Sequence, residues 1–180
     1  MVTYVALLRG INVGGKNQIK MAELRACFEA NGFEDATTYI QSGNVVFRSE
    51  RTGSADLTRR IESMLAKAFG YPASVVLRDR RQMRAIVERA PRGFGAEPNA
   101  YRYDVIFLKE PLTAKVAMKS VQTRPGVDEA HPGPGALYFS RLTSRASQSR
   151  LTKIVSMPIY QSMTIRNWNT TTTLLRMMEA

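Results

Sequence analysis

The order of strand-like and helix-like segments is the feature of this sequence that most restricts its fold. Residues 2–8 form a short apolar run typical of a buried strand. Residues 21–31 carry apolar side chains at helical spacing and are followed by Gly32, an expected helix end. Two β-rich runs, 37–41 and 44–48, then flank a Ser-Gly pair, which favours a hairpin.

The segments that follow complete one structural unit. Ser54 is a candidate N-cap for a helix with apolar residues at helical spacing, and Gly70 is its expected end. Residues 74–77 read as a strand, and Asp79 can cap a further helix that Pro91 ends. The first half therefore has the order β-α-β-β-α-β with a trailing helix, which is the order of the ferredoxin-like α-β plait.

The second half repeats this order after a linker-like stretch, PRGFGAEPNA at 91–100. Its expected elements are strands at 101–108, 127–130, 136–140 and 163–166, the middle pair joined by the turn HPGPG, and helices at 112–121 (opened by Pro111), at 147–155 and after Asn167 or Asn169. The prediction is an α+β protein of two tandem ferredoxin-like α-β plaits, with domains at 1–92 and 93–180.

The ends of the two halves resemble each other in sequence. VVLRDRRQMRAIV (75–87) and MTIRNWNTTTTLL (163–175) align with Arg78 over Arg166 and with Asp79 over Asn167. Each segment reads as a strand, then an arginine, then a capping side chain, then a helix. This pattern favours an internal duplication.

The charge balance favours anionic partners. The chain has 26 Lys and Arg against 15 Asp and Glu, a net charge of +11, and residues 130–178 contain no acidic residue. Such a balance suits nucleic acid, nucleotides or other phosphate-bearing ligands. The alternative is a solvated basic surface that maintains solubility.

The loop after the first strand is the first candidate site. Gly10 to Lys16 matches the phosphate-loop pattern G-x-x-x-x-G-K, but Asn17 stands where a Ser or Thr would bind Mg²⁺, and hairpins replace the expected parallel sheet. The pattern therefore disfavours a nucleotide-hydrolysing loop. Anion binding remains open, because Gly14 and Gly15 can expose backbone N–H groups beside Arg9 and Lys16. Alternatively, the glycines only adopt backbone angles that other residues avoid.

Two further segments carry polar groups suited to binding. Gln41, Ser42 and Asn44 lie in the predicted hairpin turn, although a plain turn would use the same residues. Arg166, Asn167 and Trp168 lie near the C-terminus, where the only tryptophan could stack on a base or sugar. There the alternative is a tryptophan that anchors the last helix, with asparagines as caps. The predicted ligand-binding residues are Arg9, Asn12, Gly14, Gly15, Lys16, Gln41, Ser42, Asn44, Arg166, Asn167 and Trp168.

Several chemistries find no support in the sequence. His131 is the only histidine, so a histidine-based metal site is excluded, and Cys27 falls on an apolar helix face as a core residue. We expect no metal and no cofactor. The single cysteine, the lack of a signal-peptide pattern and the lack of a long apolar stretch predict a cytoplasmic protein without membrane association.

Three segments of the chain resemble one bacterial family, the domain of unknown function 1697. They are LLRGINVGGKN near the start, TYIQSGNVVF in the hairpin and MTIRNWNT near the end. The resemblance implies a fold of two α-β plaits and implies no activity. The family pattern falls on Arg9, Gly10, Asn12, Gly14, Gly15, Lys16, Ser42, Gly43, Asn44, Arg166, Asn167 and Trp168.

The leading functional hypothesis is a protein that binds an anionic ligand, a nucleic acid or a nucleotide, on a basic polar face. In it Arg9, Lys16 and Arg166 contact phosphate, while asparagine and glutamine side chains supply polar recognition. An enzyme acting on a phosphorylated small molecule is one alternative, although the sequence contains no evident general base. A protein-interaction module is another. The sequence determines neither the oligomeric state nor whether any reaction is catalysed.

Overall fold

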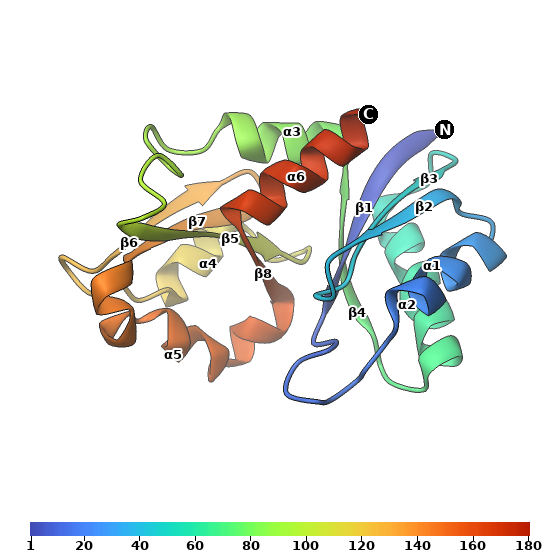
Figure 1. Ribbon diagram of the computed structural model, residues 1–180, viewed down its shortest axis with the longest axis horizontal. Helices are drawn as coiled ribbons and strands as arrows, with labels where there is room; N and C mark the ends of the chain where they lie inside the picture. Colours follow the sequence, from blue (N-terminus) through green and yellow to red (C-terminus); the bar gives the residue numbers. More distant parts are fainter. The chain divides into compact units, whose positions relative to one another are not determined.

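Two four-stranded antiparallel sheets form the framework of the computed structural model, which describes residues 1–180 (Figure 1). The strands are β1 (Val2–Arg9), β2 (Glu34–Tyr39), β3 (Asn44–Ser49), β4 (Ser74–Asp79), β5 (Tyr101–Leu108), β6 (Asp128–Gly133), β7 (Ala136–Leu142) and β8 (Met163–Asn167). The helices are α1 (Met21–Ala30), α2 (Ser54–Phe69), α3 (Arg80–Glu88), α4 (Ala114–Ser120), α5 (Leu151–Val155) and α6 (Trp168–Glu179), with 3₁₀ helices η1 (Thr143–Gln148) and η2 (Pro158–Ser162).

The two sheets have the same internal order. The first runs β2-β3-β1-β4 and the second β6-β7-β5-β8, so β5 takes the place of β1 and β8 that of β4. This confirms the predicted α+β fold of two tandem ferredoxin-like plaits.

The chain divides into two compact units. Unit 1 comprises residues 1–83 and 174–180, and unit 2 comprises residues 84–173, so the division falls inside α3 and inside α6. The domain limits predicted from the sequence, 1–92 and 93–180, stay a prediction.

Unit 1 packs α1 and α2 on one face of its sheet (Figure 1). The expected apolar face of α2 is buried, and Gly70 ends the helix in a left-handed conformation with φ of +72°. The prediction that Ser54 caps α2 is wrong by one residue. The helix begins at Ser54, and Gly53 is the N-cap, whose carbonyl accepts a hydrogen bond from the Leu57 N–H at 3.0 Å.

Unit 2 packs α4 and α5 against its own sheet, with two differences from the predicted elements. Helix α4 begins at Ala114 rather than at residue 112, because the Thr113 hydroxyl caps it by accepting from the Val116 N–H at 3.3 Å. Strand β6 extends to Gly133, so only two residues join β6 to β7 where the turn HPGPG was expected.

The helix predicted at 147–155 is instead split into η1 and α5. The buried Asp128 carboxylate accepts a hydrogen bond from the Ser149 hydroxyl at 2.6 Å and another from the Arg150 N–H at 2.8 Å. Because the Arg150 N–H bonds to Asp128, it is not available to a helical carbonyl four residues earlier. Apolar spacing alone could not reveal this long-range interaction.

The duplication is visible in atomic detail at the strand–helix junctions. Arg78 lies opposite Val5 and donates from Nη1 to the carbonyl of the preceding residue at 2.8 Å, and Arg166 lies opposite Val105 and does the same at 2.9 Å. Asp79 Oδ1 accepts from the backbone N–H three residues later at 2.8 Å. Its counterpart Asn167 accepts in the same way at 2.7 Å.

Candidate functional site

The glycine loop leaves the end of β1 and is held in place mainly by one side chain. Asn12 has a left-handed backbone with φ of +52°, and its Nδ2 donates to the carbonyls of Ile19 at 3.1 Å and of Gln41 at 2.8 Å. Its Oδ1 accepts from the Ile19 N–H at 2.8 Å. Asn12 therefore closes the loop on itself and ties it to the hairpin turn.

The tip of this loop is exposed and positively charged. Gly14 and Gly15 have φ of +59° and +75°, so the alternative reading of the glycines, that they supply unusual backbone angles, applies to both. Lys16 lies beside them with an exposed side chain, and its N–H donates to the Val13 carbonyl at 3.1 Å. Helix α1 begins only at Met21, whereas a phosphate loop leads straight into its helix.

The hairpin turn uses its polar residues to support its own shape. Asn44 is fully buried, and its Nδ2 donates to the Tyr39 carbonyl at 2.8 Å and to the Ser42 Oγ at 3.1 Å. Gly43 (φ +84°) packs so closely that a Cβ atom there would lie 2.9 Å from the Leu8 Cβ. Of the predicted turn residues, Gln41 has the most exposed side chain.

The third motif segment belongs to unit 2. Arg166 is buried, and its Nη1 also donates to the Thr164 Oγ1 at 2.8 Å. Burial lowers the pKa of Arg166 to about 10, so the guanidinium remains charged at neutral pH. Trp168 packs edge-to-face against Phe94, with ring centroids 5.1 Å apart. The loop and the turn thus meet in unit 1, while a single site made of all three segments stays a prediction.

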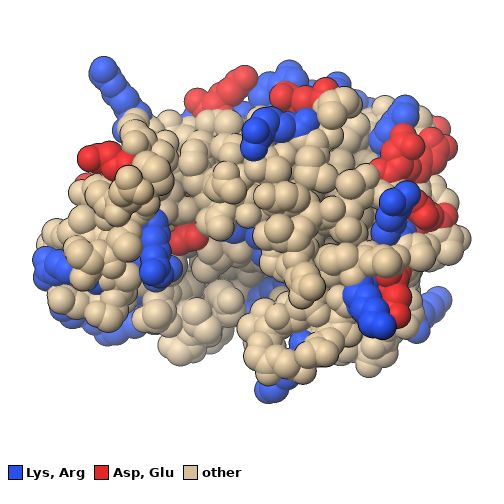
Figure 2. All heavy atoms as spheres, in the orientation of Figure 1, with Lys and Arg blue, Asp and Glu red and all other residues tan.

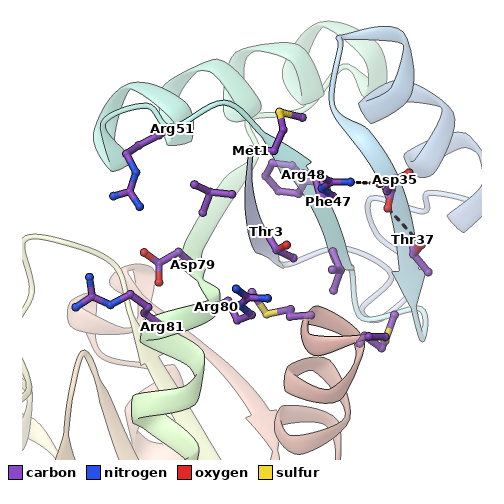
Figure 3. A pocket seen from close by; sticks show the side chains of 15 residues that line it. Met1, Thr3, Asp35, Thr37, Phe47, Arg48, Arg51, Asp79, Arg80 and Arg81 are labelled. Atoms are coloured by element: carbon purple, nitrogen blue, oxygen red, sulfur yellow. Dashed lines mark hydrogen bonds and ion pairs between the residues drawn. The ribbon is translucent and has the colours of Figure 1, made fainter.

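A pocket of about 840 Å³ lies in unit 1, at the other end of β1 from the glycine loop (Figure 3). It is lined by Met1, Val2, Thr3, Asp35, Thr37, Val46, Phe47, Arg48, Arg51, Asp79, Arg80, Arg81, Met177, Met178 and Ala180. The lining combines apolar side chains, among them Val46, Phe47 and Met178, with charged ones. None of these residues was among the predicted site residues.

Some of the charged side chains around this pocket have a partner within the chain, and others do not. Figure 3 shows the Arg48–Asp35 ion pair, 3.0 Å long, on one side and Arg51, Asp79 and Arg81 on another. Asp79 caps α3: its Oδ1 accepts from the Gln82 N–H, and its own backbone N–H donates to the Gln82 Oε1, both at 2.8 Å. The side chains of the remaining arginines, Arg51, Arg80 and Arg81, form no ion pair or hydrogen bond with the chain. The run RDRR at 78–81 was the only sequence signal of this cluster.

The overall charge is not gathered into one continuous basic surface on the face in view. Figure 2 shows Lys and Arg interspersed with Asp and Glu there. The local arrangement around a pocket therefore says more about binding than the net charge of +11 does.

Other chemistries have little structural basis. No group of three or more His, Cys, Asp or Glu residues is placed to hold a metal ion. Cys27, expected in the core, is only partly buried and packs against the core of unit 1, and burial raises the pKa of its thiol, which disfavours the reactive thiolate. His131 lies 3.6 Å from the Glu129 carboxylate in an exposed position. None of the helices has the length and apolar character needed to span a membrane.

The repeated sheets and junctions define a tandem α-β plait protein. A family described as "Protein of unknown function (DUF1697)" matches residues 1–138, and the chain belongs to that family, which confirms the resemblance seen in the motifs. A solved structure, that of the conserved bacterial protein SP0830 from Streptococcus pneumoniae, is similar with a TM-score of 0.86 and 28% identity over 98% of both chains. No curated protein matches. These comparisons establish the family and the fold, and their descriptions state no activity.

Proposed function

We propose that this protein binds an anionic ligand, a nucleic acid or a nucleotide, through unit 1. The observation that carries the proposal is the set of three arginines, Arg51, Arg80 and Arg81, that border one pocket without an anionic partner in the chain. Guanidinium groups bind phosphate through paired, charge-assisted hydrogen bonds. An anion in the pocket would also reduce the mutual repulsion of the three cations.

The placement of these arginines supports the proposal further. Arg80 and Arg81 occupy the first turn of α3, where the helix dipole disfavours positive charge. Of the acidic side chains that line the pocket, Asp35 pairs with Arg48 and Asp79 caps α3. A phosphate would therefore give this cluster the anionic partner that the pocket's acidic side chains do not provide.

The glycine loop offers a second place for anion contact. The N–H groups of Gly14 and Gly15 have no acceptor within the chain, and the exposed Lys16 lies next to them. Strand β1 separates this loop from the arginine pocket by eight residues, which corresponds to about 25 Å at 3.3 Å per residue. A mononucleotide cannot reach both places, whereas a nucleic-acid strand can.

The test compares two charge-removing variants with matched controls. Binding of labelled single-stranded RNA, duplex DNA and a labelled nucleoside triphosphate would be measured by fluorescence anisotropy at low salt. The pocket variant is Arg80→Ser with Arg81→Ser, and the loop variant is Lys16→Ala. Arg59→Ala and Lys67→Ala remove exposed charges from α2 and serve as controls.

The pattern of loss identifies the ligand class. If the ligand is a nucleic acid, both variants weaken binding, and the log–log salt slope falls by about 0.7 to 0.9 for each lost phosphate contact. If it is a nucleotide, only one of the two variants affects binding. Equal loss in the controls, or no binding of any probe at low salt, contradicts the proposal.

A further inference from the structure

A second pocket, of about 420 Å³, lies on one face of the unit 2 sheet. Glu129 of β6 lies opposite Ser140 of β7, and Ser140 lies opposite Tyr103 of β5, so the three side chains share this face. Phe139, the next residue along β7, points to the other face and packs in the core with α4 and α5. The pocket is therefore on the side of the sheet away from these two helices.

Aromatic rings form part of the pocket lining. Phe94, from the segment after α3, contacts Tyr103 edge-to-face with ring centroids 4.9 Å apart. Tyr101 lies two residues before Tyr103 on the same strand face, and their ring centroids are 6.0 Å apart. The Tyr103 hydroxyl accepts a hydrogen bond from the Glu97 N–H at 3.2 Å, which holds the tip of the ring. The faces of such rings are electron-rich and attract cations.

Two carboxylates lie in the same pocket as these rings. Glu97 and Glu129 both line it, and neither side chain accepts a hydrogen bond from the chain. The Glu129 carboxylate lies 3.6 Å from the His131 imidazole, which is too long for a hydrogen bond. Arg92 also lines the pocket but forms no ion pair with either glutamate. The pocket thus has two carboxylates against one arginine, the opposite of the balance in the whole chain, whose net charge is +11.

Ser140 gives a second, independent indication of a ligand. It is only 9% exposed and lines the pocket, and its hydroxyl forms no hydrogen bond within the chain. Polar side chains buried to this extent usually have a partner, because leaving one without a hydrogen bond costs stability. A ligand that donates a hydrogen bond inside the pocket would provide that partner.

We propose that this pocket binds an organic cation that carries a guanidinium group. A guanidinium is planar and stacks on aromatic faces, and its N–H groups donate to carboxylates and hydroxyls. The pair Tyr101 and Tyr103 would contact its face. Glu97, Glu129 and Ser140 would accept its hydrogen bonds. This site is independent of the anion site proposed in unit 1, since it recognises the opposite charge.

A charged ligand and its neutral isostere test the proposal. The full-length protein would be titrated, by isothermal titration calorimetry, with n-butylguanidinium and with n-butylurea, which has nearly the same shape but no charge. We expect saturable binding of the cation and about tenfold weaker binding of the urea, the combined effect of two exposed ion pairs. n-Butylammonium keeps the charge without the planar group and should bind more weakly than n-butylguanidinium.

Two peptides separate the possible sources of the guanidinium group. One is an acetylated and amidated tripeptide with a central arginine, and the other has citrulline, its neutral isostere, at the same place. Tighter binding of the arginine peptide than of n-butylguanidinium would assign the pocket to a peptide partner, and weaker binding would assign it to a small molecule. Both outcomes support the proposal if the citrulline peptide binds less tightly than the arginine peptide.

Variants assign the contacts. Because the Ser140 hydroxyl has no partner in the chain, Ser140→Ala should not lower the melting temperature, yet it should weaken n-butylguanidinium binding about tenfold, the effect of one hydrogen bond to a charged group. Glu97→Gln and Glu129→Gln should each weaken binding about twofold to fivefold. Glu110→Gln makes the same chemical change at an exposed position outside the pocket and should have no effect.

The proposal fails if n-butylurea binds as tightly as n-butylguanidinium, or if neither binds at millimolar concentration. It also fails if the three pocket variants bind the cation as the wild-type protein does. Equal binding of n-butylammonium contradicts recognition of the planar group. The variant Arg80→Ser with Arg81→Ser should bind n-butylguanidinium normally, whether or not unit 1 binds an anion, and a loss of cation binding in it would place the cation elsewhere.

Discussion

Asn12 donates a hydrogen bond of 2.8 Å from its side-chain Nδ2 to the backbone carbonyl of Gln41, 29 residues further along the chain. This bond joins the glycine loop to the hairpin turn, which are two of the three family motifs. Asn12 thus shapes the loop, and Asn44 shapes the turn in the same manner. In the proposed function, the loop groups that contact the ligand are Lys16 and the N–H groups of Gly14 and Gly15.

Replacing Asn12 should destabilise the protein in two separable steps. Asn12→Gly tolerates the positive φ but loses the hydrogen bonds to Ile19 and Gln41, and we expect a loss of about 1–3 kcal/mol. Asn12→Ala also adds backbone strain, which costs about 1 kcal/mol more. Urea unfolding followed by circular dichroism measures both. If Asn12 instead serves only to contact a ligand, the Asn12→Gly variant will unfold at the same urea concentration as the wild-type protein.

Two glycine-to-alanine substitutions should differ sharply although both positions have positive φ. At Gly43 a methyl group would lie 2.9 Å from both Ile11 Cγ1 and Leu8 Cβ, so we expect a loss of about 2–4 kcal/mol from strain and overpacking. At Gly15 no atom lies within 4 Å, so only the strain of about 1 kcal/mol applies. Thermal unfolding of the two variants side by side would test this, and equal losses would contradict the tight packing at Gly43.

The carboxylate of Asp104 should lower stability at neutral pH. Its pKa is raised in the folded state, so the folded protein holds this proton more tightly than the unfolded chain does. Ionisation above that pKa therefore favours unfolding, and the wild-type protein regains this stability as the pH falls through the raised pKa of Asp104. We expect Asp104→Asn to melt at a higher temperature at pH 7, with the difference shrinking in acid.

The control for this effect is a carboxylate that is exposed. Glu110→Gln, in the same unit, should leave the melting temperature nearly unchanged across the same pH range. A lower melting temperature for Asp104→Asn at pH 7 would mean that attraction to Arg141 outweighs the burial of the carboxylate.

Asp128 should be the most sensitive acidic position in unit 2. Its carboxylate accepts from the N–H groups of Arg124 at 2.9 Å and Arg150 at 2.8 Å and from the Ser149 hydroxyl at 2.6 Å. Asp128→Ala leaves these buried donors without an acceptor, and we expect a loss of about 3 kcal/mol or more in chemical denaturation. The isosteric Asp128→Asn should lose less, because it retains one acceptor oxygen. If both variants lose a similar amount of stability, the negative charge of Asp128, rather than the number of acceptor oxygens, is what stabilises the protein.

Local sequence patterns predicted the strands and most of the helices because each depends on neighbours in the chain. Apolar spacing identified α2, and the strand–arginine–cap order identified the junctions at Arg78 and Arg166. The local pattern gave a wrong helix where a side chain from a distant segment forms hydrogen bonds with the backbone. Asp128 interrupts the helix expected at 147–155, and no local feature of that segment indicates an acceptor some twenty residues away.

For the candidate sites, too, some features follow from local sequence and others from tertiary structure. The amino-acid sequence by itself determined the tandem plait fold, the duplicated junctions and the motif segments, since periodicity, capping and glycine placement are local properties. Only the tertiary structure decided that Asn12 and Asn44 support their loops, that Arg51 joins Arg80 and Arg81 at one pocket, and that the largely buried Asp104 lies near Arg141. These relationships depend on strand pairing between segments far apart in the chain, which brings charges together or removes them from water.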